Sequence, residues 1–186
     1  MKARPTQSPG EVTLELNRRD EPLMEAASRT TPRSPFKLKH ILVPVDFSDC
    51  SKKALEYALP LAQEHNAVIT LLFVVEPAYG AGEYGGVDYS NLKRDAKEHG
   101  ERELDKLATD ELHRDVSVVS LVRTGSPSRE IIEAAENLPA DLIVISTHGR
   151  TGLKHVFLGS VAEHVVQRAP CPVLVVRERE REILAT

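Results

Sequence analysis

Residues 141–161 read DLIVISTHGRTGLKHVFLGSV, and this stretch decides the fold. The apolar run from Asp141 to Ile145 has the length and the β-branched content of a strand buried on both faces. A loop begins at Ser146. Beyond Gly159, the apolar positions 161, 165, 166 and 169 fall on one helical face, so a helix starts near Gly159. The stretch therefore predicts a strand, a glycine-marked loop and a helix N-terminus.

This order of elements is typical of an anion site. The first turn of a helix leaves backbone N–H groups unpaired and carries the positive end of the helix dipole, and both favour a phosphate. Glycines nearby let an anion approach the backbone. The alternative is that Gly149 and Gly152 are ordinary turn glycines and that Gly159 only begins a helix. Both interpretations stay open at this point.

The composition predicts one globular domain with a tail: 186 residues, of which 41% are apolar and 28% charged. No apolar run is long enough for a membrane span, and the N-terminus lacks the apolar segment of a secretory signal, so we expect a cytoplasmic protein without membrane contact. Cys50 and Cys171 lie far apart without a CxxC pattern, which argues against a zinc site and a disulfide framework. We expect two reduced, packed thiols.

The charge is unevenly spread along the chain. Residues 1–39 carry eight basic and five acidic side chains, whereas residues 40–186 carry 16 basic and 23 acidic ones. An acidic body does not suit nucleic acid, which needs a basic face. Four Phe, four Tyr and no Trp also provide few platforms for base stacking. We therefore expect no nucleic-acid partner.

The chain is expected to consist of three parts. Residues 1–37 are Pro-rich and have the composition of a disordered or loosely docked arm, although Val12–Leu16 alternates like a short strand. Residues 38–178 form the folded domain, and residues 179–186 form a charged tail. No internal repeat is present.

Strands and helices are expected to alternate through the folded domain. The apolar patterns predict strands at 39–46, 67–75, 116–122, 141–145 and 173–176, and helices at about 48–66, 91–112 and 159–169, with a further helix that starts at 126. Ser48 is expected to cap the first helix, and Ser126 with Pro127 to begin the third. Residues 77–90 predict a mobile surface loop. The order indicates an α/β fold with an open, doubly wound, five-stranded parallel sheet and helices on both faces.

Ligands of such sheets bind beyond the carboxyl ends of the strands, at the point where the strand order reverses. Asp46 and the loop after Ile145 both lie at strand carboxyl ends. If strands one and four are neighbours, the acid and the helix start face one crevice. This pairing favours a nucleotide, with the acid on a ribose hydroxyl or a phosphate-bound metal and the backbone on the phosphates. The alternative is that Asp46 caps the next helix.

Four segments together resemble the universal stress protein family: ILVPVDFS (41–48), LLFVVEP (71–77), TGSPSREII (124–132) and STHGRTGLKHVFLGSVAEHVVQRAPCPVLVVR (146–177). The resemblance covers essentially all of residues 40–177 and implies a Rossmann-like, adenine-nucleotide α-hydrolase-like fold. The signature of the ATP-binding branch is Gly, two residues, Gly, nine residues and then Gly-Ser or Gly-Thr. This chain has Gly149, nine residues and Gly159-Ser160, but Ser146 stands in place of the first glycine. The added Cβ and hydroxyl could crowd a ligand, or the hydroxyl could donate to it.

Carried over position by position, the resemblance implies an adenine-nucleotide site. Asp46 approaches the ribose, and Val74 offers its main chain to the adenine. His148 is expected to act through its main chain and not as a general base. Arg150 and Lys154 could steer the phosphates or could simply be solvated. The implied binding residues are Pro44, Val45, Asp46, Val74, Ile145, Ser146, His148, Gly149, Gly159, Ser160 and Val161, of which Val74 and Ile145 are equally good core residues.

The resemblance implies a stress-response regulator that binds ATP with Mg²⁺ or Mn²⁺ and forms a homodimer through the edge strand at 172–177. An apolar edge strand must be paired or covered, and the Pro-rich leader could cover it instead. Two other classes stay open, a dimeric interaction module without nucleotide and a slow Mg-dependent ATPase. Because no GxxxxGK[ST] loop and no evident base are present, we expect at most weak ATP hydrolysis, with Asp46 acting through nucleotide-bound Mg²⁺.

Overall fold

The computed structural model describes residues 2–5, 12–15, 37–77, 89–110, 116–149 and 158–177. The chain divides into two compact units, Met1–Phe36 and Lys37–Thr186. In the first unit, β1 (Lys2–Pro5) pairs antiparallel with β2 (Val12–Glu15), in agreement with the alternation seen in the sequence. The remainder of the leader, residues 78–88 of the expected loop and the charged tail lie outside the described residues.

The second unit contains a five-stranded parallel sheet in the order β5-β4-β3-β6-β7. Its strands are β3 (His40–Pro44), β4 (Val68–Val75), β5 (Val118–Thr124), β6 (Leu142–Ser146) and β7 (Val173–Val176). The central strands β3 and β6 are neighbours, with Leu42 opposite Ile143. The predicted doubly wound sheet is thus confirmed, and its order reverses between β3 and β6.

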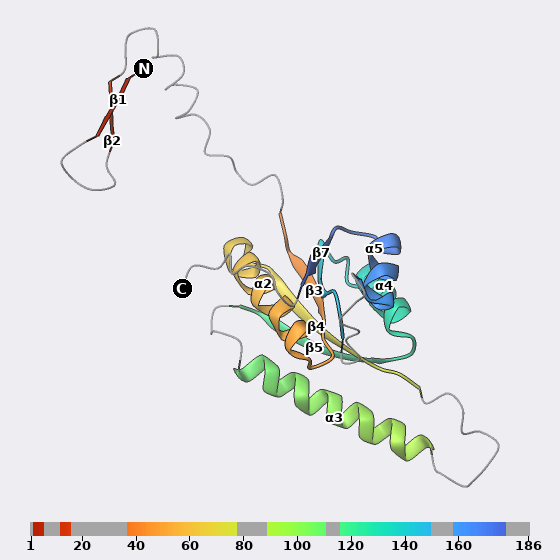
Figure 1. Cartoon of the computed structure of the whole chain (residues 1–186). Coiled ribbons are helices and arrows are strands. Elements are labelled where there is room, and N and C mark those ends of the chain that lie inside the picture. Colours follow the sequence, from red (N-terminus) through yellow and green to blue (C-terminus); the bar gives the residue numbers. More distant parts are fainter. Residues whose placement is uncertain are drawn as a thin grey trace. The chain divides into compact units, whose positions relative to one another are not determined.

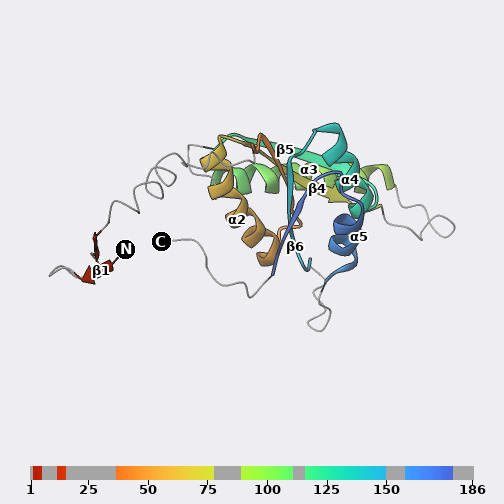
Figure 2. The same ribbon diagram turned by 90° about the horizontal axis from the view of Figure 1, so that it is seen from above.

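Helices cover both faces of this sheet (Figures 1 and 2). Figure 2 shows α2 (Asp49–His65) on the opposite side of the sheet from α4 (Pro127–Asn137) and α5 (Ser160–Arg168). The helix α3 (Tyr89–Asp110) packs on the same face as α2, since its Leu104 shares a buried cluster with Leu55 and Leu71. Leu72 belongs to the other cluster, because consecutive strand residues point to opposite faces.

The helix ends follow from local chemistry. Ser48 caps α2 as predicted, its side chain accepting a hydrogen bond from the Ser51 amide, and Asn66 ends the helix in the left-handed conformation. Ser126 precedes Pro127 at the start of α4, but its side chain makes no capping hydrogen bond. The expected Ser126 cap is therefore correct in position only.

Boundaries of three elements differ from the expected ones by two residues, and the first of these, β3, was expected to continue to Asp46 but ends at Pro44. The helix α3 begins at Tyr89, within the stretch expected to be a loop, and β5 covers 118–124 instead of 116–122. The end of β5 is decided by its pairing with β4, which continues to Val75↔Thr124. Pairing between strands extends a strand beyond the residues that its own sequence favours.

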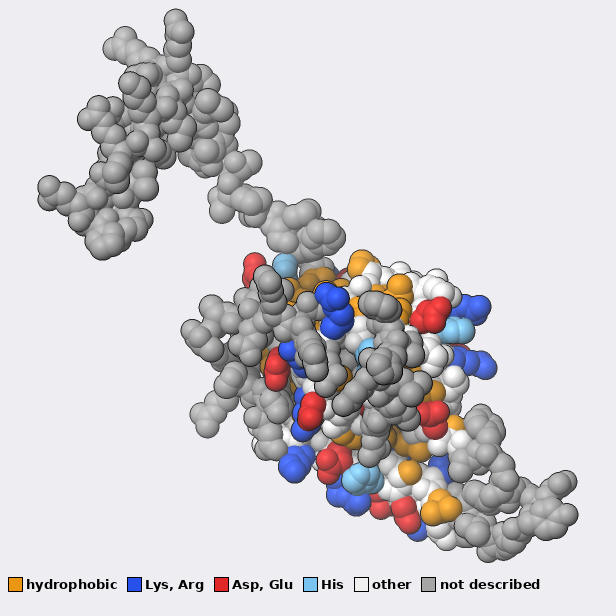
Figure 3. Space-filling model, viewed as in Figure 1, with side chains coloured by type: hydrophobic (Ala, Val, Ile, Leu, Met, Phe, Trp, Pro, Cys, Tyr) orange, Lys and Arg blue, Asp and Glu red, His pale blue; other side chains and the backbone are white. Residues whose placement is uncertain are grey.

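The long helix α3 has the solvated face that its charges predict. Arg94–Glu98 and Lys97–Glu101 form exposed pairs at 3.7 Å with i,i+4 spacing, and charged side chains gather over α3 in Figure 3. None of the described helices is long and apolar enough to cross a bilayer. Cys50 and Cys171 are both half-buried and form no disulfide, and burial raises the pKa of the Cys171 thiol.

Candidate functional site

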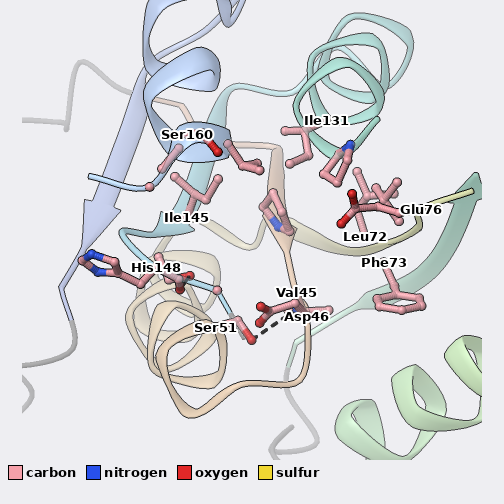
Figure 4. Close-up of a pocket in the computed structure, with 18 of the residues that line it drawn as sticks. Val45, Asp46, Ser51, Leu72, Phe73, Glu76, Ile131, Ile145, His148 and Ser160 are labelled. Atoms are coloured by element: carbon pink, nitrogen blue, oxygen red, sulfur yellow. Dashed lines mark hydrogen bonds between the residues drawn. The ribbon is translucent and has the colours of Figure 1, made fainter. Parts of the chain in front are cut away.

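A pocket of about 490 Å³ opens at the carboxyl ends of β3, β4 and β6 (Figure 4). Small-ligand sites commonly have volumes of roughly 300–1,000 Å³. The structure brings to this pocket the eleven binding residues that the family resemblance implies: Pro44, Val45, Asp46, Val74, Ile145, Ser146, His148, Gly149, Gly159, Ser160 and Val161. The acid after β3 and the helix start after β6 meet here because β3 and β6 are adjacent in the sheet.

Asp46 takes part in the helix start and in the pocket wall. Its Oδ1 accepts hydrogen bonds from the Ser48 amide at 3.1 Å and from the Ser48 hydroxyl at 2.6 Å. Its Oδ2 lies beside Gly149, where an added Cβ would come within 2.6 Å of that oxygen. One carboxylate oxygen thus organises the beginning of α2, while the other lies against a glycine of the pocket.

The first turn of α5 supplies backbone donors to the pocket. Ser160 and Val161 line the pocket, and amides in the first turn have no intrahelical acceptor. Gly159 precedes them as the N-cap and has no side chain that could bond to them. The Gly159 amide itself donates to the Thr147 carbonyl at 2.8 Å. This amide therefore closes the loop on Thr147.

The loop between β6 and α5 is held by its own polar groups. The hydroxyl of Ser146, a residue only 9% exposed, donates to the His148 carbonyl at 2.9 Å. Ser146 stands in place of the first glycine of the signature, and its hydroxyl stabilises the turn here. The Nδ1 atom of His148 lies 3.0 Å from Thr147 Oγ1, and Figure 4 shows its imidazole directed away from Asp46. This arrangement fits the expected main-chain role of His148. Arg150 and Lys154 lie outside the described residues.

The main chain of Val74 faces the pocket at the end of the β3–β4 ladder. Leu72 faces β3, since its carbonyl accepts from the Val45 amide, and Val75 faces β5, since its carbonyl accepts from the Gly125 amide. Strand residues alternate in direction, so the N–H and C=O of Val74 point toward β3. The ladder with β3 ends at Pro44↔Leu72, two residues before Val74. A hydrogen-bond donor and an acceptor thus border the pocket side by side.

Sequence reasoning missed about half of the pocket wall. Glu76 directly follows β4, and Figure 4 shows its carboxylate directed into the pocket. Its position after a strand was a signal that could have identified it. Ala96 and His99 come from α3, and Pro127 and Ile131 come from α4. The position of these four residues in the pocket wall depends on how the helices pack on the sheet, which no local sequence pattern encodes.

The charges along the pocket are acidic. Among the described residues that line it, Asp46 and Glu76 are carboxylates, and none is Lys or Arg. The described residues also contain no group of three His, Cys, Asp or Glu side chains that could hold a metal ion. Within this part of the chain, the positive potential that an anion would meet comes from backbone amides and the N-terminal end of the α5 dipole.

Comparison with known proteins identifies relatives of the second unit. A model of the universal stress protein family matches residues 37–177. The universal stress protein MJ0531 of Methanocaldococcus jannaschii is 37% identical over 144 residues, which cover 77% of this chain and 85% of that protein. The solved structure of universal stress protein UspA from Lactobacillus plantarum superimposes with a TM-score of 0.67 at 30% identity, covering 76% of this chain and 99% of that one.

Two more distant solved structures were determined with a nucleotide. One is a universal stress protein in complex with cAMP, with a TM-score of 0.55, 22% identity and coverage of 76% of this chain and 98% of that one. The other is a universal stress protein family protein from Arabidopsis thaliana with AMP bound, with a TM-score of 0.51, 21% identity and coverage of 79% and 96%. At these identities, the similarity to the two structures shows a shared fold and nothing further.

Proposed function

The chain belongs to the universal stress protein family, and from this premise we propose that it binds an adenine nucleotide, ATP with Mg²⁺ or Mn²⁺, and acts as a stress-response regulator. The binding site is the pocket at the carboxyl ends of β3, β4 and β6. One observation carries the proposal: Asp46, Gly149 and the first turn of α5 line a single pocket although they come from three separate segments. An acid opposite a backbone anion site suits a ligand with a ribose and phosphates.

The adenine edge fits the main chain of Val74. Adenine presents an amine donor at N6 beside an acceptor at N1, which match a backbone C=O and N–H. Guanine presents an acceptor at O6 and a donor at N1. Its O6 would therefore face the Val74 carbonyl oxygen, and its N1–H would face the Val74 N–H, so neither pair could form a hydrogen bond. The pocket therefore favours adenine over guanine through unfavourable contacts with the wrong base as well as favourable contacts with the right one.

The phosphates fit the start of α5. Ser160 and Val161 offer unpaired amides, and Gly149 leaves space beside the loop. Because Asp46 and Glu76 are acidic and no described lining residue is Lys or Arg, a bare triphosphate would meet repulsion. A divalent cation carried by the nucleotide reduces that repulsion.

Relatives of the same fold support the choice of ligand class. Two solved universal stress proteins carry cAMP and AMP, both adenine nucleotides. Because their identity to this chain is low, they support only the class of ligand that the fold accepts. The individual contacts are argued from the residues of this chain described above.

We propose regulation by binding, with at most weak ATP hydrolysis. Hydrolysis requires a base that activates water, and the imidazole of His148 is directed away from Asp46. The bound nucleotide would instead stabilise one conformation or one dimer. The dimer would form through β7, an edge strand whose Val173, Leu174 and Val175 are only half-buried.

The test is thermal unfolding of the full chain with and without excess Mg-ATP, after removal of any co-purified nucleotide. Ligand at about 100 times its dissociation constant adds roughly 2.7 kcal/mol, or several degrees in a domain of this size. Ser160→Asp should abolish the rise, since it places a negative charge beside the phosphates. The same charge is favourable at a helix N-terminus, so this variant should remain folded.

Ser160→Asn is the matched control, of similar size and without the charge, and it should retain the rise. The absence of a rise in the wild type would reject nucleotide binding and leave the interaction module. Sustained release of ADP that disappears in Asp46→Ala would show an ATPase instead.

A further inference from the structure

The hydroxyl of Ser48 bonds to Asp46 in addition to capping α2. We propose that Ser48 is a positioning residue of the nucleotide site: it holds the Asp46 carboxylate so that Asp46 Oδ2 accepts a hydrogen bond from a ribose hydroxyl. This inference rests on the proposed function, and it assigns a role to a side chain that does not itself line the pocket.

Two donors of Ser48 converge on one oxygen. The Ser48 hydroxyl and amide lie 2.6 Å and 3.1 Å from Asp46 Oδ1. A distance of 2.6 Å between hydroxyl and carboxylate oxygens is typical of a charge-assisted hydrogen bond, one of the stronger kinds in proteins. A carboxylate held at one oxygen by two donors loses its freedom to rotate about the Cβ–Cγ bond. The position of Oδ2 is then decided by Ser48.

The serine pair behind Asp46 closes a small ring of hydrogen bonds. The hydroxyl of the buried Ser51 donates to the Ser48 carbonyl at 2.9 Å, and Ser51 Oγ accepts from the Asp46 amide at 3.3 Å. The Ser51 amide donates to Ser48 Oγ at 3.3 Å. Since Ser48 Oγ accepts from Ser51, its own proton goes to Asp46. The ring therefore gives the Ser48 hydroxyl a single direction.

The backbone between the two residues is strained in a way that serves this contact. Phe47 has a φ of 65°, in the left-handed region that residues other than glycine rarely adopt. This turn brings Ser48 back over the Asp46 carboxylate. The ring of Phe47 packs on Phe73, with centroids 4.7 Å apart, which helps to offset the strain. Strained residues that the surroundings hold in place cluster at functional sites.

The opposite side of the carboxylate is closed by Gly149, whose Cα leaves room for Oδ2 and for no larger group. The carboxylate is thus held between a donor pair and a glycine before any ligand arrives. Such preorganisation raises affinity because binding need not immobilise the side chain. A role limited to helix capping would not require the hydroxyl proton to point at Asp46.

The test compares two variants that cap a helix about equally well. Threonine and glycine rank together as N-caps, but only threonine keeps the hydroxyl. Ser48→Thr and Ser48→Gly are titrated calorimetrically with Mg-ATP and with Mg-dideoxy-ATP, which lacks both ribose hydroxyls. In the wild type and in Ser48→Thr, ATP should bind more tightly than dideoxy-ATP. In Ser48→Gly this preference should fall by about tenfold, the equivalent of one hydrogen bond to a charged group.

The possible outcomes separate this inference from the proposal on which it rests. If wild-type protein binds neither nucleotide, the proposed function fails and this inference fails with it. If wild-type protein binds both equally, or if Ser48→Gly weakens both by the same factor, nucleotide binding stands and the positioning role of Ser48 is rejected. Thermal unfolding without nucleotide checks that the two variants are equally folded.

Discussion

Gly149 lies directly against the carboxylate of Asp46: a methyl group on Gly149 would come 2.6 Å from Asp46 Oδ2. The two residues follow β6 and β3, the adjacent strands at which the order of the sheet reverses. Only a hydrogen atom fits between the loop and the acid, because Ser48 holds the other carboxylate oxygen. The glycine is thus required by a contact between two strand ends that are distant in the sequence.

Gly149→Ala should weaken ATP binding at least tenfold, since the methyl group must displace a carboxylate that is anchored by hydrogen bonds. Isothermal titration calorimetry measures the effect. The control is a double-mutant cycle with Asp46→Ala: once the carboxylate is absent, the same methyl group should have little further effect. Equal losses in both backgrounds would show that Gly149 acts independently of Asp46.

Val175→Pro should convert a β7-mediated dimer into a monomer. The Pro172 carbonyl accepts from Ile143 of β6 and the Val176 carbonyl accepts from Thr147 directly after β6, so residues 172, 174 and 176 face that strand. The amide of Val175 then points outward from the sheet edge. Proline removes this outward donor and is tolerated on edge strands. Light scattering coupled to gel filtration gives the mass.

The matched control for this interface is Val175→Ala, which trims the side chain but keeps the amide and should leave the dimer intact. A dimer that survives Val175→Pro would exclude pairing through β7.

Asp141→Asn should reduce stability at neutral pH but not in acid. Asp141 Oδ2 accepts from the amides of Lys39 at 2.7 Å and His40 at 3.0 Å, joining the starts of β6 and β3. The hydrogen bond from Lys39 is the main cause that lowers the pKa of Asp141 below its usual 3.8, although burial opposes it. A lowered pKa means that the charged form stabilises the fold above the unfolded value, and that this contribution is lost as the pH falls through the folded value.

The expected difference at neutral pH is about 1 kcal/mol, reduced from that of a buried charged hydrogen bond by solvent screening. Urea unfolding at neutral pH and below about pH 3 measures it. Asp105→Asn, on the exposed side of α3, serves as a control and should show little change at either pH. A constant deficit in Asp141→Asn at all pH values would contradict the linkage.

Gly100→Ala should destabilise the protein by about 1–2 kcal/mol although alanine favours helices. Gly100 is buried in α3 against Phe73 of β4, and an added Cβ would lie 2.7 Å from Phe73 Cε1. In a Phe73→Leu background the same change should be neutral or stabilising, since the ring is gone. Chemical denaturation of the four proteins gives the coupling energy. A wild-type background in which Gly100→Ala raises stability would show that α3 shifts to make room.

Much of the site could be predicted because it depends on where strands and helices end. Asp46 follows an apolar run, and Ser160 follows a glycine that begins a helix, so both positions can be read locally. That the two positions share one crevice depended on β3 and β6 being neighbours, which the sequence could not establish and the sheet pairing shows. The walls from α3 and α4 could not be predicted, because the tilt of a helix on a sheet depends on side-chain packing over many residues.

The amino-acid sequence by itself determined the order of the elements, the parallel sheet and the edge of the sheet where ligands would bind. Apolar periodicity and strand ends are local properties, and the doubly wound topology limits how they can be assembled. Only the tertiary structure decided how individual atoms are used. The Gly159 amide closes the loop on Thr147, the Ser146 hydroxyl bonds to the His148 carbonyl, and Asp46 divides its oxygens between Ser48 and Gly149. A hydrogen bond forms within a few tenths of an ångström and along a direction, and the path of the folded backbone sets both.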